Sequence, residues 1–122
     1  MSAEKLELGD VVTARFPAQD PQGREQEGYR PAVVVGLPEL LGRPRFELVF
    51  VVPLTTDRQG SWSRSALYPR LGAGVGGLSK DSIVLLEQTR ALDTGRMARY
   101  LGQLTGEQYR PIKQGLTRIC AL

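Results

Sequence analysis

A run of polar residues that leads into an apolar segment carries the most suggestive chemistry of this chain. Residues 23–35 read Gly-Arg-Glu-Gln-Glu-Gly-Tyr-Arg-Pro-Ala-Val-Val-Val, so charged and amide side chains precede an uninterrupted apolar stretch. Arg30 stands at the entrance to that stretch, where a rigid strand can aim its guanidinium. Because a guanidinium presents several donors in one plane, Arg30 is well suited to bind a phosphate through paired hydrogen bonds.

Two hydroxyl side chains, Thr55 and Thr56, follow a second apolar run and could act together with Arg30. Each of these residues also has a plain structural alternative. Arg30 could form a surface ion pair, and threonines at the end of a strand often cap a turn. Taken singly, each residue is better explained by its structural alternative.

Several other kinds of site are excluded or disfavoured. The chain has no histidine, which excludes a histidine-based acid–base pair, a serine–histidine triad and the usual zinc or copper sites. Acidic residues are scattered without a close pair, so we expect neither a bound metal nor metal-dependent phosphodiester cleavage. The run Gly72–Gly77 matches a dinucleotide-binding fingerprint, but no helix is expected after it, so we interpret it as a flexible connection. The single cysteine, Cys120, has apolar neighbours and is expected in the core.

The bulk composition predicts one globular domain covering residues 1–122, with 41% hydrophobic and 24% charged residues. The net charge is +3, and 13 of the 16 basic residues are arginine. This bias favours a nucleic-acid partner, although a GC-rich genome would produce it too. Residues 1–9 are polar, no apolar run of ~18 residues occurs, and cysteine is rare, which together predict a cytoplasmic protein without a membrane segment.

Short apolar segments separated by turn residues predict a compact antiparallel barrel. The expected strands cover residues 11–16, 32–35, 46–52, 65–68, 82–86 and 100–104. The second of them, apolar throughout, is expected to be central, and Pro53 is expected to end the third. A long loop should fill residues 17–28.

The C-terminal segment instead has the pattern of a helix. Thr105 and Gln108 match a capping box, and apolar residues then recur at spacings of three and four. Pro111 removes a backbone donor, so we expect the helix to begin late or to bend at that position.

Taken together, these segments resemble the MazF/PemK family of endoribonuclease toxins from bacterial toxin–antitoxin systems. The resemblance begins at Gly9-Asp10-Val11-Val12 and continues through Gly23-x-Glu25-Gln26-x-Gly28-x-Arg30-Pro31-Ala32-Val33-Val34. It resumes at Val52-Pro53-Leu54-Thr55-Thr56 and again over residues 81–93, so the blocks are in order over nearly the whole chain.

The resemblance implies a mainly β fold, a small SH3-like antiparallel barrel (CcdB/MazF-type) with a C-terminal α-helix. It implies a cytoplasmic homodimer that cuts single-stranded RNA at short sequences without metal or cofactor. A cognate antitoxin with an acidic, disordered segment would neutralise it. The implied catalytic pair is Arg30 and Thr55. The implied RNA contacts are Glu25, Gln26, Thr56, Glu87 and Gln88.

RNA cleavage is compatible with the absence of histidine, because RNA carries its own nucleophile, the ribose 2′-hydroxyl. Attack by this hydroxyl on the adjacent phosphate yields a 2′,3′-cyclic phosphate. The protein must align the attack and stabilise the added charge, for which Arg30 and Thr55 supply fixed positive charge and donors. Arginine stays protonated, so a buried Glu25 or Glu87 is the better chemical candidate for a general base.

Several alternatives remain open at this point. Arg24 is either an added phosphate contact or a solvated loop residue. Trp62 either stacks on an unpaired base or folds back onto the barrel. At the level of function, the alternatives are a non-catalytic toxin of the same fold that binds a protein, as gyrase poisons do, and a catalytically silent RNA-binding module.

Overall fold

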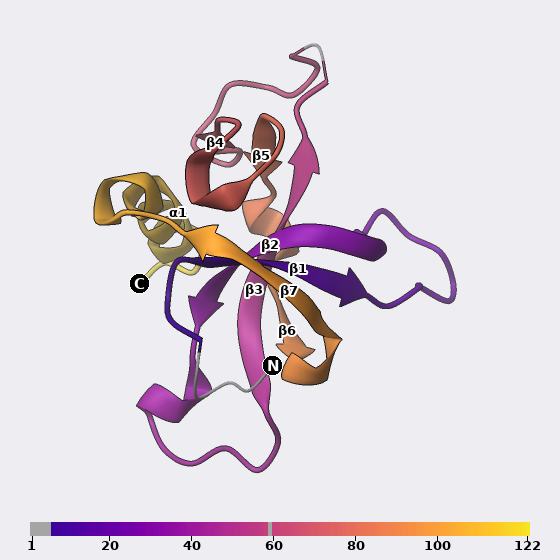
Figure 1. The fold of residues 1–122 in the computed structure, drawn as a ribbon, viewed down its shortest axis with the longest axis vertical. Coiled ribbons are helices and arrows are strands. Elements are labelled where there is room, and N and C mark those ends of the chain that lie inside the picture. The colour runs from indigo at the N-terminus through magenta and orange to yellow at the C-terminus, as the bar shows by residue number, and fades with distance from the viewer. Residues whose placement is uncertain (1–5, 59) are drawn as a thin grey trace.

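The chain forms one strongly curled antiparallel sheet, with a helix packed against one side (Figure 1). The computed structural model describes residues 6–58 and 60–122. Residues 1–9 were used to predict a cytoplasmic protein, and the first five of them lie outside the described residues. The order across the sheet is β4-β5-β3-β2-β1-β7, and β6 also pairs with β3. The predicted mainly β barrel with a C-terminal helix is confirmed as a curled half-barrel. The elements are β1 (Asp10–Phe16), β2 (Gly28–Gly36), β3 (Leu48–Thr56), β4 (Arg70–Leu71), β5 (Ser82–Val84), β6 (Arg90–Asp93), β7 (Met97–Gln103) and α1 (Gly106–Ile119).

Strands β1, β2 and β3 are buried on both faces because successive side chains belong to two different cores. Val33 packs in the core that α1 covers with Ile112, whereas Val34 packs in the core on the opposite face. Side chains alternate across a strand, so a strand buried on both faces must be apolar at every position. This explains the uninterrupted apolar run of β2 and its predicted central position.

Strand β3 continues beyond the point predicted from the sequence. Pro53 was expected to end it, but the strand runs on to Thr56. Pro53 still pairs with Ala32, and its carbonyl accepts a hydrogen bond from the backbone nitrogen of Leu85 at 3.0 Å. The missing proline N–H is tolerated because β3 changes partners here, from β2 to β5.

Two further strand assignments were wrong. Residues 65–68 form a turn, in which the Tyr68 backbone nitrogen donates to the Ser65 carbonyl at 3.1 Å, and the Arg70 side chain binds the Tyr68 carbonyl that a strand would offer to a neighbour. Strand β6 was missed because it is only four residues long and buries only Leu92. Its pairing with β3, rather than its own pattern, makes it a strand.

Helix α1 begins at Gly106, before Pro111, so the expected late start is wrong. The predicted capping box is present: the Gln108 backbone nitrogen donates to Thr105 Oγ1 at 3.2 Å, and the Thr105 nitrogen donates to Gln108 Oε1 at 2.9 Å. Cys120, expected in the core, is exposed, as are residues 117–119 of the last helical turn. In the described parts of the chain, no helix has the length and apolarity needed to cross a membrane.

The glycine-rich run is a closely packed turn rather than a loose connection. It contains the short 3-10 helix Val75–Gly77, which passes directly over β7. A Cβ added to Gly77 would overlap the backbone carbonyl of Leu101, and one added to Gly102 would lie 2.8 Å from the backbone of Gly76. The absence of side chains therefore lets two segments of backbone touch.

This packing predicts a large cost for one small substitution. Gly77→Ala places a methyl group on the Leu101 carbonyl and forces alanine into a left-handed backbone, φ +77°. We expect the free energy of unfolding to fall by about 2–4 kcal/mol, measured by urea denaturation. Gly74→Ala is the matched control, since Gly74 has φ +90° but nothing within 4 Å of an added Cβ. It should cost only about 1–2 kcal/mol, and equal losses in the two variants would refute the packing explanation.

Candidate functional site

Arg30 and Thr55 reach one place from neighbouring strands. The ladder between β2 and β3 ends at the pair formed by Ala32 and Pro53. Arg30 and Thr55 each lie two residues beyond that pair, at the same end of the ladder. Residues two apart on a strand point to the same face, so the register sets these two side chains across from one another. Both line a hollow of about 460 Å³, here called the arginine–threonine hollow.

Each member of the pair is held locally. The exposed Arg30 side chain donates from Nε to the backbone carbonyl of Glu27 at 3.2 Å, a contact that uses one of its five N–H donors. Thr55 is half-buried and pairs with Ile83 on β5, so its backbone is part of the sheet. A loop carbonyl therefore binds the guanidinium of Arg30, and a paired strand carries Thr55.

The arginine–threonine hollow is rich in hydroxyls and positive charge. Thr56, a predicted RNA contact, lines it together with Thr13, Ser79 and Ser82. Two cations that the sequence analysis did not single out, Lys80 and Arg99, also line it. No motif marks them, since they belong to distant segments. None of the described residues of this lining is acidic, so the hollow offers donors and positive charge to an anion.

The other predicted contacts gather in a second cavity of about 450 Å³, the glutamine hollow. Glu25, Gln26, Glu87 and Gln88 line it. The Gln26 backbone nitrogen donates to Gln88 Oε1 at 2.7 Å, which ties the long loop to the 3-10 helix Leu86–Gln88. The Gln26 Oε1 atom is buried and has no hydrogen-bond partner among the described residues, so it is an acceptor without a donor.

A third hollow of about 540 Å³ links these two. Arg30 lines both this linking hollow and the arginine–threonine hollow, whereas Glu25 and Gln26 line both it and the glutamine hollow. The predicted residues other than Arg24 therefore line three hollows that share lining residues. Arg24 is the exception, because it is exposed on the loop and lies outside the linings of all three hollows.

The hypothesis of a buried carboxylate base does not agree with the structure. Glu25 and Glu87 are both exposed and line the glutamine hollow rather than the arginine–threonine hollow. Glu25 folds over Gly23, where an added Cβ would overlap its carboxylate. Glu87 accepts a hydrogen bond from the Tyr68 hydroxyl at 2.9 Å.

Trp62 folds back onto the protein in this structure, as one of the two alternatives expected. Its ring meets the Tyr68 ring edge-on, with centroids 5.1 Å apart. Arg70 holds this segment, donating to the backbone carbonyls of Trp62, Ser63 and Tyr68 at 2.8–2.9 Å. The Arg70 guanidinium therefore holds the backbone that carries both aromatic rings. Tyr68 in turn donates a hydrogen bond to Glu87, which lines the glutamine hollow.

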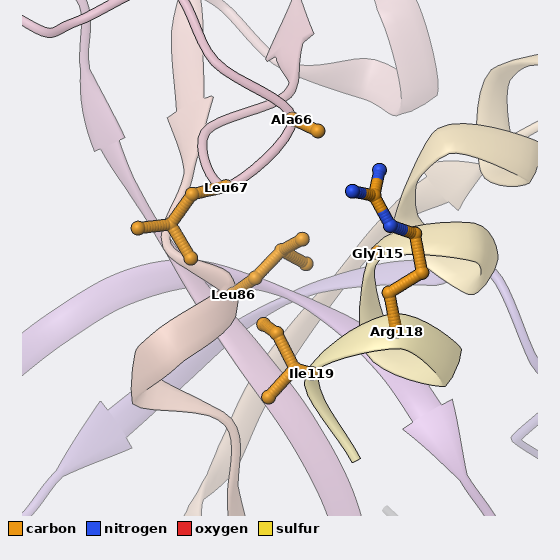
Figure 2. A pocket seen from close by; sticks show the side chains of 6 residues that line it. All are labelled: Ala66, Leu67, Leu86, Gly115, Arg118 and Ile119. Carbon is orange, nitrogen blue, oxygen red and sulfur yellow. The ribbon is translucent and has the colours of Figure 1, made fainter. Parts of the chain in front are cut away.

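Two further hollows lie beside helix α1. One of about 700 Å³ has Arg110, Lys113 and Arg118 in its lining, and the smaller one has a different character. Figure 2 shows Leu86 and Ile119 lying between α1 and the segment that carries Ala66 and Leu67. This hollow of about 290 Å³ is largely apolar, and Arg118 is its one charged lining residue. It lacks the convergent donors of the arginine–threonine hollow and is a less suitable phosphate site. Among the described residues, no group of three or more His, Cys, Asp or Glu side chains is placed to hold a metal ion.

The Tyr68–Glu87 contact has a measurable titration. The hydrogen bond to Glu87, desolvation and the nearby carboxylate charge all raise the pKa of Tyr68 above its ordinary 10.0. The contribution of this contact to stability is therefore complete below pH 10.0 and is lost as the pH rises through the raised pKa. We expect tyrosinate absorbance, compared between the wild type and Tyr68→Phe, to report this raised pKa. Glu87→Gln should lower the Tyr68 pKa towards 10.0, and no change would rule out the carboxylate as the cause.

The role of Arg70 can be tested through Trp62, the only tryptophan. Arg70→Met removes the donors to three carbonyls, so the segment should loosen and the Trp62 fluorescence should shift to the red and be quenched more readily by acrylamide. We expect a stability loss of about 1–3 kcal/mol. Arg64→Met, an exposed arginine of the same segment, should leave the spectrum unchanged. Identical spectra for the wild type and Arg70→Met would contradict this account.

Comparison with known proteins identifies the family of this chain. A sequence model of the family described as "PemK-like, MazF-like toxin of type II toxin-antitoxin system" matches residues 7–120. The structure is similar to MazF (Form-I) from Deinococcus radiodurans, with a TM-score of 0.71 and 25% identity over 96% of this chain and 97% of that chain. It is also similar to MazE-MazF (Form-II) from the same organism, with a TM-score of 0.69 and 25% identity over 96% of each chain.

A more distant similarity extends to an endoribonuclease in complex with its cognate antitoxin from Mycobacterial species. The TM-score is 0.68 at 20% identity, over 96% of each chain. At that identity the likeness concerns the fold alone. The family match, in contrast, spans nearly the whole sequence, including the strand ends that carry Arg30 and Thr55. The chain belongs to the family of PemK-like, MazF-like toxins of type II toxin–antitoxin systems.

Proposed function

We propose that this toxin is a metal-independent endoribonuclease that cuts single-stranded RNA at selected sequences. The proposal rests on one observation: Arg30 and Thr55 line the same hollow. The described lining of that hollow includes three cations and no acidic residue. Toxins of this family are generally endoribonucleases, which supports the reaction class. A non-catalytic toxin that only binds a protein has no evident need for the pair of Arg30 and Thr55.

In the proposed reaction, the ribose 2′-oxygen attacks the adjacent phosphorus. A new bond forms between that oxygen and phosphorus, and the bond to the 5′-oxygen of the next nucleotide breaks. The 2′-hydroxyl loses its proton to a base, and the departing 5′-oxygen takes one up, leaving a 2′,3′-cyclic phosphate and a 5′-hydroxyl. Arg30 stabilises the negative charge that builds up on the phosphoryl oxygens, and the Thr55 hydroxyl adds a donor from a fixed strand.

Sequence selection would fall to the glutamine hollow. Its glutamates and glutamines offer acceptors and donors that suit the edges of unpaired bases. The buried Gln26 Oε1, which lacks a partner, is an acceptor that a base amino group could satisfy. The linking hollow that Arg30 shares with Gln26 supports a continuous path from the read bases to the cleaved phosphate.

The proposed partners follow from the same surfaces. An acidic antitoxin segment, disordered until bound, would compete with RNA for the cation-rich hollow in the cytoplasm. A second copy of the chain would cover exposed apolar side chains on β3 and the connection before it. These are Leu40, Leu41, Phe46, Leu48 and Phe50. Several large apolar side chains exposed within residues 40–50 are typical of an association surface, which supports a homodimer.

The decisive measurement is incubation of the purified toxin with long single-stranded RNA in EDTA. We expect discrete fragments that end in a cyclic phosphate. Arg30→Ala and Thr55→Ala should each lower the cleavage rate by about 100-fold or more, because each removes a donor to the charge of the transition state.

Matched controls lie on the exposed face of α1. Arg110→Ala and Thr117→Ala remove the same side-chain types far from the strand ends and should cut at the wild-type rate. Thermal melts should show that all four variants fold. Intact RNA that comigrates with the wild type would replace the proposal with an RNA-binding module. Intact, unbound RNA together with inhibited gyrase would replace it with a non-catalytic toxin.

A further inference from the structure

Three cations share the arginine–threonine hollow without an acidic partner in its described lining, and only one of them belongs to the predicted catalytic pair. Arg30 stands beside Thr55, whereas Lys80 and Arg99 line the same 460 Å³ from other segments. Like charges in one hollow repel each other and disfavour the folded state. Unfavourable repulsion of this kind is expected at functional sites, where a bound ligand of opposite charge compensates for it. A ligand that neutralises three cations must carry more than one negative charge.

The sheet places Arg99 in a row with the catalytic strand. Thr13 on β1 pairs with Pro31 on one side and with Arg99 on the other. Strands are spaced by about 4.8 Å, so the Arg99 backbone lies roughly 10 Å from that of β2, with Thr13 between them. Paired residues point to the same face, so Thr13, Pro31 and Arg99 share one face of the sheet, whereas Arg30, one residue before Pro31, is directed to the other face. All four residues line the hollow, which lies where β2 leaves the ladder with β3.

The glycine run brings Lys80 to the same wall. Gly77 packs against the backbone of Leu101, and Gly76 against that of Gly102. Lys80 follows Gly77 by three residues, and Arg99 precedes Leu101 by two. The backbone contact therefore sets the two cation-bearing segments side by side. Added Cβ atoms at the glycines would push the segments apart, so the wall depends on this close approach.

An aromatic side chain completes the arrangement. Tyr29 neighbours Arg30 on β2, lines the same hollow and is 67% exposed. An exposed tyrosine beside arginines is typical of surfaces that bind single-stranded nucleic acid, where bases stack on the ring. Its large exposed area has no structural role in either hydrophobic core.

We propose that Lys80 and Arg99 form a second phosphate subsite, which holds the RNA phosphate next to the one being cleaved, and that Tyr29 stacks on an adjoining base. This inference rests on the proposed RNA cleavage and extends it. Contacts to phosphates carry no sequence information, so the subsite should strengthen binding without changing which sequence is cut.

The test is RNA binding over a salt series. The probe is a fully 2′-O-methylated oligonucleotide of a sequence that the wild type cuts, since it lacks the 2′-hydroxyl nucleophile. Lys80→Gln and Arg99→Gln should each weaken binding at low salt and lower the slope of log K against log salt by about 0.7, the value for one phosphate contact on a single strand. Tyr29→Leu should weaken binding about tenfold with an unchanged slope. Lys113→Gln and Arg110→Gln on α1 serve as controls and should retain the wild-type slope.

The outcomes separate this inference from the proposed function. If the wild type cuts RNA and the Lys80 and Arg99 variants bind with wild-type affinity and slope, the subsite is refuted while the nuclease assignment stands. Altered cut sites in these two variants would also refute it, because they would indicate base contacts. If the wild type leaves RNA intact, the proposed function fails, whatever the salt slopes are. Reduced slopes with unchanged cut sites support the subsite.

Discussion

Burial of the three central strands on both faces is the constraint on which the rest of this structure depends. Neighbouring valines such as Val33 and Val34 enter different cores, so the middle of β2 has no position for a polar side chain. Polar chemistry can stand only where the strands leave both cores. Arg30 and Thr55 occupy such positions, each two residues beyond the last pair of the ladder between β2 and β3.

The second requirement is the contact of backbone with backbone at the glycine run. Curling of the sheet brings the segment before β5 across to β7, where Gly77 meets Leu101. This contact closes one side of the half-barrel and builds a wall of the arginine–threonine hollow from residues far apart in the sequence. Fold stability and site geometry therefore depend on the same few glycines.

The charges around the strand ends are sorted by type. The arginine–threonine hollow collects cations and hydroxyls without an acid in its described lining, whereas the glutamine hollow contains two carboxylates, three glutamine amides and one cation, Arg90. Phosphates are best bound by the first set and base edges by the second, which is the division expected for selective recognition of single-stranded RNA. Arg70 and Tyr68 add rigidity, because they fix a long connection against the residue Glu87.

Local pattern in the sequence was enough to predict β1, the central place of β2, the capping box of α1 and the antiparallel barrel class, which the structure shows as a half-barrel. Each of these depends on residues close together in the chain, such as Thr105 with Gln108. The pairing of Arg30 with Thr55 was expected from ordered motif blocks. Only the tertiary structure decided that Pro53 lies inside β3 and that Cys120 is exposed. It also decided that Lys80 and Arg99 share a hollow with the pair, because strand partners and backbone approaches between distant segments leave no periodic signature in the sequence.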